Sequence, residues 1–134
     1  MRSVLSVLLA VLVAGGCSDS VGPGDISGKW AEDFSIPGSF FEMDLTATGS
    51  DISGIGNFCG EAGPCGTITV NGTINGIQVH LNFVSTAQVP QVDPIVNSHF
   101  DGHLTTPKTL KGTIAIDPPN LPAGNPAEVT YRRE

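Results

Sequence analysis

Along most of the chain, short segments alternate apolar and polar residues and are separated by Gly, Pro, Asn and Asp. Beyond the first residues, no window shows convincing helical periodicity. Alternation with a period of two is typical of strands that bury one face. The pattern predicts eight strands, at residues 25–34, 39–46, 51–58, 67–74, 77–84, 98–105, 109–116 and 127–133.

The clearest hairpin signal lies between the fourth and fifth of these segments. Asn75-Gly76 is a dipeptide that two-residue type I′ turns prefer, which predicts that Ile74 faces Ile77. In this register, one face of both strands is apolar or glycine and the other is polar. Ile74 and Ile77 are therefore expected to point inward, next to the turn.

Two further hairpins follow from the same test. Leu45 is predicted to face Ile52 across the turn between the second and third segments. Leu104 is predicted to face Leu110 across the turn between the sixth and seventh segments. Both registers again place apolar residues and glycines on one side of the sheet.

Eight sequential strands that each have one apolar face favour an antiparallel up-and-down meander closed into a barrel. An open β-sandwich of eight strands is the alternative. Because consecutive loops of a meander lie at opposite ends, one end is expected to be tightly closed and the other, the mouth, to carry long loops. The short loops are predicted at 47–50, 75–76 and 106–108, and the others at 35–38, 59–66, 85–97 and 117–126.

The first residues are typical of a secretory signal. Arg2 precedes an apolar run over residues 4–14, which is shorter than the roughly 20 residues that span a bilayer. Small residues and Cys17 follow this run, and the stretch Leu12-Val13-Ala14-Gly15-Gly16-Cys17 resembles the bacterial lipobox. An ordinary signal peptide followed by an unmodified cysteine is the alternative.

In lipoproteins with this motif, the cysteine carries fatty acids such as palmitate and the preceding peptide is removed. The resemblance therefore implies a signal peptide at 1–16, a lipidated N-terminus and flexible spacer at 17–24, and a barrel domain at 25–134. It also implies an exported protein that a lipid anchors to a cell-envelope membrane, the outer membrane if the host has one.

Charge and cysteine content agree with export. The net charge is −7, and loss of residues 1–16, which hold one Arg and no acid, would make it −8. This acidic balance argues against a nucleic-acid partner. With Cys17 lipidated, Cys59 and Cys65 remain as an even pair, which is expected to form a disulfide in an oxidising compartment.

Gly28-Lys29-Trp30 in the first strand matches the G-x-W motif that opens lipocalins and related calycin barrels. The chain therefore resembles a lipocalin-like barrel. The resemblance implies that Trp30 packs near the closed end, beneath an arginine from a late strand. Arg133 is the matching candidate, because it is in phase with Val129 and Tyr131, the inward positions of the last segment.

The predicted inner face is rich in phenylalanine on its mouth side, and Glu32 is expected to point inward there. These phenylalanines, here called the collar, predict a binding site for a small apolar ligand at the open end of the barrel. The alternative is that the aromatic rings simply fill the interior while mid-height glycines let the strands approach. The candidate ligand-binding residues are Glu32, Phe34, Phe41, Phe58, Phe83 and Phe100.

Other chemistry is sparse in the sequence. His99, Asp101 and His103 share one strand face, with His80 expected on the same outer surface, but their spacing does not favour a metal site. No catalytic or cofactor motif is present, so neither an enzyme nor a cofactor is expected. The alternatives to ligand binding are a protein-binding module, such as a periplasmic protease-inhibitor-like barrel, and a structural envelope lipoprotein.

Overall fold

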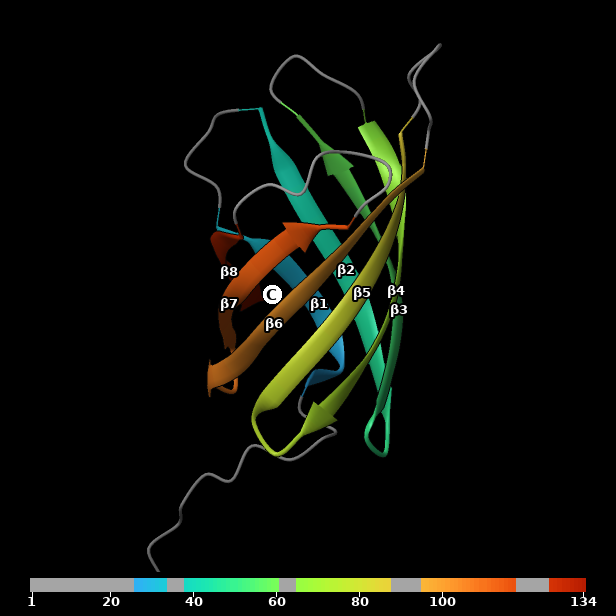
Figure 1. Cartoon of the computed structure of the whole chain (residues 1–134). Helices are drawn as coiled ribbons and strands as arrows, with labels where there is room; N and C mark the ends of the chain where they lie inside the picture. Colours follow the sequence, from blue (N-terminus) through green and yellow to red (C-terminus); the bar gives the residue numbers. More distant parts are fainter. Residues whose placement is uncertain (1–25, 34–37, 61–64, 88–94, 118–125) are drawn as a thin grey trace, which may run out of the picture.

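The protein forms a closed antiparallel barrel of eight strands that follow one another around it in chain order. Figure 1 shows the computed structural model, which describes residues 26–33, 38–60, 65–87, 95–117 and 126–134. The strands are β1 (Gly28–Glu32), β2 (Phe40–Thr48), β3 (Asp51–Cys59), β4 (Cys65–Asn75), β5 (Gln78–Ala87), β6 (Ile95–Thr106), β7 (Thr109–Ile116) and β8 (Ala127–Arg133). Because β1 also pairs with β8, the predicted all-β up-and-down barrel is confirmed and the open sandwich is excluded.

The two ends of the barrel differ in their connections. At one end, here called the base, consecutive strands are joined by two-residue turns. These turns join β2 to β3 at 49–50, β4 to β5 at 76–77 and β6 to β7 at 107–108. The base is at the bottom of Figure 1. The longer connections belong to the opposite end, the mouth. Since β1 begins at the base, the chain enters the barrel there. Within the described residues, no helix is long and apolar enough to cross a bilayer.

The predicted register of the β4–β5 hairpin is wrong by two residues. Asn75 pairs with Gln78 and Ile74 pairs with Val79, so the turn residues are Gly76 and Ile77. The primed turns of two-residue hairpins need a positive φ at their first central position, and Gly76 supplies it with a φ of 61°. Ile77 is consequently a turn residue with 44 % of its surface exposed, and not an inward residue of the base.

The β2–β3 register is wrong in the same way. Gly49, with a φ of 62°, takes the first central position, and Leu45 faces Gly54 instead of Ile52. A shift of two residues leaves every side chain on its predicted face, because the side-chain period of a strand is also two. Apart from Ile77, which lies in the turn, the inward and outward assignments therefore survive both errors.

The predicted β6–β7 register is confirmed, with Leu104 facing Leu110. Here the turn residues are Pro107 and Lys108, and β6 has one extra residue between Leu104 and Thr106. This irregularity absorbs the length of the predicted three-residue loop while keeping both leucines inside.

One apolar core fills the barrel from base to mouth. Inward positions of all eight strands contribute to it, and outward positions are mostly polar and exposed. The buried apolar residues are Ile26, Trp30, Met43, Leu45, Ile52, Ile68, Val70, Ile74, Val79, Leu81, Phe83, Phe100, Leu104, Leu110 and Tyr131.

At the base, the residues of the G-x-W motif and Arg133 form hydrogen bonds and close contacts. Trp30 is fully buried, and its indole Nε1 donates a hydrogen bond of 2.8 Å to the carbonyl oxygen of Ile26. Arg133 pairs with Trp30 across β1 and β8, and its guanidinium donates to the carbonyl oxygen of Ser27. Gly28 has a φ of 132°, and a Cβ there would lie 3.1 Å from Arg133 Nε. The arginine thus lies against a glycine backbone at the base.

Higher in the barrel, β6 and β7 approach each other through a facing pair of glycines, Gly102 and Gly112. A Cβ on Gly112 would lie 2.7 Å from Cζ of Phe100 and closer still to the carbonyl oxygen of Asp101. A Cβ on Gly102 would collide with the same ring. The two glycines therefore make room for the Phe100 ring and let the sheet bend.

This packing predicts that Gly112→Ala destabilises the barrel. Because the added methyl group meets backbone as well as the Phe100 ring, the free energy of unfolding should fall by about 1–3 kcal/mol. Urea unfolding measures the change. The matched control is Thr113→Ala at the exposed neighbouring position, which should cost less than about 0.5 kcal/mol. An equal cost for the two variants would contradict the close approach.

Candidate functional site

The phenylalanines of the predicted collar pack into the core. Phe83 and Phe100 are fully buried, whereas Phe41 and Phe58 are partly buried and rest against the core. The rings of Phe41 and Phe83 meet edge to face, with centroids 5.6 Å apart. Phe34 lies outside the described residues. The collar therefore lines and fills the interior, and its partly buried members are the ones nearest to solvent.

Two of these rings pack against Tyr131, an inward position of the last predicted segment that is not among the predicted ligand-binding residues. Its ring centroid is 5.5 Å from those of Phe41 and Phe100, and the residue is fully buried. Its hydroxyl has no hydrogen-bond partner among the described residues. A buried hydroxyl without a partner costs about 1–3 kcal/mol, so such groups are rare in native structures.

Glu32 faces Tyr131 directly across the β1–β8 pairing. It shares the inner face with Trp30, as the alternation of β1 requires, and it ends β1 on the mouth side. Its side chain remains partly exposed. The neighbouring Asp33 is exposed instead, and its carboxylate accepts a 2.9 Å hydrogen bond from Arg132. The inner wall thus carries one carboxyl group and one phenol at paired positions of β1 and β8.

Burial changes the acidity of both groups. Desolvation raises the pKa of Glu32 from its usual 4.5 to about 7, so the carboxyl group is partly protonated at neutral pH. Burial, and secondly the charge of Glu32, raises the pKa of Tyr131 above its usual range. The hydroxyl therefore stays protonated and can both donate and accept a hydrogen bond. Perturbed groups of this kind cluster at functional sites.

A second polar group lies on the outer wall of β5 and β6. His80 Nδ1 is 2.5 Å from Asp101 Oδ1, and His99 Nδ1 is 2.6 Å from Asp117 Oδ1. His99 Nε2 lies 3.8 Å from the other oxygen of Asp101, which links the two pairs. His80 lies on this surface as predicted. His103 is the cross-strand neighbour of Lys111 on β7, as the predicted register requires.

These exposed pairs contribute little to stability, because solvent screens them. Among the described residues, no group of three or more His, Cys, Asp or Glu side chains is placed to hold a metal ion. The inner pair is therefore the stronger candidate for a functional site.

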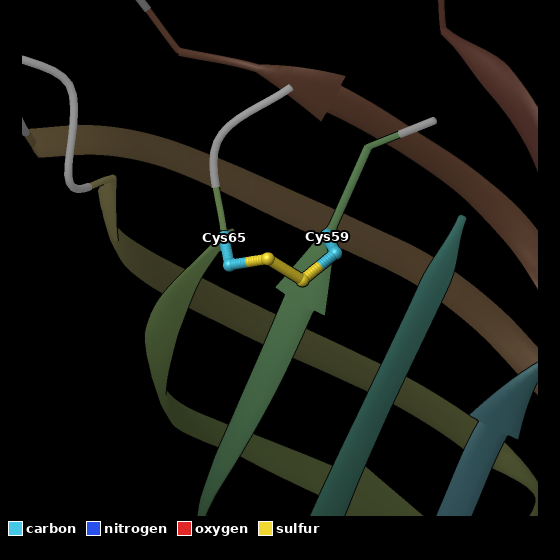
Figure 2. Close-up of a disulfide and its surroundings, with 2 residues drawn as sticks. All are labelled: Cys59 and Cys65. Carbon is cyan, nitrogen blue, oxygen red and sulfur yellow. A yellow bond between two sulfur atoms is a disulfide. The ribbon is translucent and has the colours of Figure 1, made fainter. Parts of the chain in front are cut away.

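The predicted disulfide between Cys59 and Cys65 is confirmed. Figure 2 shows it at the mouth, joining the end of β3 to the start of β4. The two residues are direct partners across the strands, with Cα atoms 4.1 Å apart. The bridge thus fixes the rim of the mouth on the side of the barrel formed by β3 and β4.

The predicted signal peptide at 1–16, Cys17 and the spacer lie outside the described residues. No family model matches this chain, and no curated protein or solved structure is significantly similar to it. The inner pair and its surroundings are therefore the basis for the functional argument below.

The unpartnered hydroxyl predicts that Tyr131→Phe raises the free energy of unfolding by about 1 kcal/mol, because it removes a buried polar atom and keeps the ring. Urea unfolding followed by the fluorescence of Trp30, the single tryptophan, measures this change. Tyr131→Leu is the control and should destabilise, since it removes the contacts with Phe41 and Phe100. A marked loss of stability in Tyr131→Phe would show that the hydroxyl has a partner.

Glu32 predicts a pH dependence of stability. The folded protein retains the Glu32 proton to a higher pH than the unfolded chain, so this contribution is fully present below about pH 4.5 and is lost as the pH rises through about 7. Relative to Glu32→Gln, the wild type should therefore lose stability over this range.

Unfolding free energies of both proteins across the same pH range test this. Glu42→Gln, at an exposed outer position of β2, is the control and should follow the wild-type curve. Parallel curves for the wild type and Glu32→Gln would show that Glu32 is not desolvated in the folded protein.

Proposed function

We propose that this chain is an exported lipoprotein that is anchored through Cys17 and binds a small ligand on the inner wall of its barrel. One observation supports ligand binding above all. The Tyr131 hydroxyl is fully buried and has no hydrogen-bond partner among the described residues. It belongs to the residue that pairs with Glu32, whose side chain is itself partly buried. Both groups cost stability in a core where apolar side chains would serve better. Binding of a polar group by this pair would offset that cost.

The shape of the interior limits the kind of ligand. Below the pair, the barrel is filled by apolar side chains down to Trp30 at the base. A ligand therefore inserts only a small part, and the partly exposed Glu32 and Phe41 are the groups that it meets first. This refines the expected apolar ligand to a small molecule that combines a hydrogen-bonding group with an apolar portion.

The chain path relates this site to the proposed anchor. β1 begins at the base, and Glu32 at its other end is on the mouth side. A lipid attached a few residues before β1 would hold the base toward the membrane and leave the mouth facing away from it. Fatty acyl chains supply about 0.8 kcal/mol per buried CH₂, so two or three of them anchor a protein stably.

Mass spectrometry of the full chain purified in detergent from the membranes of its host tests this proposal. The denatured mass should show acyl groups on the protein, and the native mass should exceed the denatured mass by that of a small molecule. Cys17→Ser should lose the acyl mass and the membrane location. Cys59→Ser breaks the disulfide, which lies outside the lipobox, and should retain the acyl groups.

The ligand mass has its own control. Glu32→Gln should reduce the fraction of protein that carries the small molecule, while Glu42→Gln on the outer wall should not. A native mass equal to the denatured mass would overturn ligand binding and favour a protein-binding or structural role. An unacylated wild type would overturn the anchor.

A further inference from the structure

The groups around Glu32 define the chemistry that the inner site favours. From β8, Tyr131 and Arg133 share the inner face with it, and Arg133 is directed to the carbonyl oxygen of Ser27 at the base. From β2, the inward neighbours are Phe41 and Met43. The surroundings of the carboxyl group on the ligand side are thus aromatic and apolar.

In the part of the chain that the structure describes, no cationic side chain compensates the charge of this carboxylate. Desolvation alone accounts for the raised pKa of Glu32, with no lowering by a nearby cation. Removing a carboxylate from water is unfavourable unless a cation or several hydrogen-bond donors accompany it. A ligand that carries a positive charge would supply this compensation.

The two neighbours of the carboxylate suit the same kind of group. The Tyr131 hydroxyl oxygen accepts hydrogen bonds, and an ammonium group has up to three N–H donors to share between it and the carboxylate. Aromatic rings attract organic cations through their negative faces, and Phe41 and Phe100 flank Tyr131. The net charge of −7 also raises the local concentration of cations near the protein.

We propose that the ligand is a small organic amine, whose ammonium group lies between the Glu32 carboxylate and the Tyr131 hydroxyl while its hydrocarbon part contacts Phe41. This rests on the proposed ligand-binding function and names the chemical class of the ligand. A neutral alcohol could reach the hydroxyl but would leave the carboxylate uncompensated. A carboxylic acid would bring a second negative charge to Glu32.

The test uses the single tyrosine of the chain as its reporter. The full chain, in a nonionic detergent near pH 8 where Glu32 is ionised, carries tyrosine that is isotope-labelled at Cζ and gives one NMR resonance. Titration with n-butylammonium should shift this resonance in a saturable way. The probes 1-butanol, with the same hydrocarbon chain, and butyrate, with a chain one carbon shorter, should not.

Variants and pH provide the controls. Glu32→Gln should weaken n-butylammonium binding by about 10-fold or more, because it removes the charge partner in a partly dry site. Glu42→Gln, an exposed acid on the outer wall, should change the affinity by about twofold at most. Near pH 5, where Glu32 is protonated, wild-type binding should weaken as in the Gln variant. The fluorescence of Trp30 verifies that each variant is folded.

Binding of 1-butanol or butyrate as tight as that of n-butylammonium would overturn the amine proposal, as would an unchanged affinity in Glu32→Gln. If the protein from its host releases a small molecule but does not respond to n-butylammonium, the amine class is wrong and ligand binding stands. If neither result is obtained, both proposals are overturned.

Discussion

Pairing between the first and last strands is the constraint on which the rest of this barrel depends. It joins Trp30 to Arg133 and Glu32 to Tyr131, residues from opposite ends of the chain. The same seam therefore builds the base, where Arg133 lies over Gly28, and the inner polar pair. Without it, β1 and β8 would be open edges, and Glu32 and Tyr131 would face solvent on separate strands.

Much of this architecture is predictable from the sequence, because a period of two decides which face of each strand is buried. The β2–β3 and β4–β5 registers were wrong, since a glycine at the first central position decides where a two-residue turn lies, and Gly49 and Gly76 occupy that position. Apart from Ile77, which lies in the turn, the predicted faces are nevertheless right, because both errors are of two residues. Local alternation thus gives the core more reliably than it gives the pairing.

The candidate site is less accessible to such reasoning. Glu32 was expected to point inward, and the inward phase of Tyr131 is visible in the alternation of the last segment. That the two residues face each other follows only from how β8 meets β1, and the stagger of a closing barrel is not encoded in any local pattern. The unpartnered hydroxyl likewise becomes visible only once Phe41 and Phe100 are seen to surround it.

The seam also has a consequence for the order of folding. Three residue pairs join β1 to β8, and the backbone amide of Glu134 donates a hydrogen bond to the carbonyl oxygen of Lys29. The hairpins from β2 to β7 can form as soon as their own residues emerge during synthesis, whereas β1 must wait for a partner about a hundred residues later. β1, the strand that follows the proposed anchor, would thus be the first strand synthesised and among the last to complete its pairing.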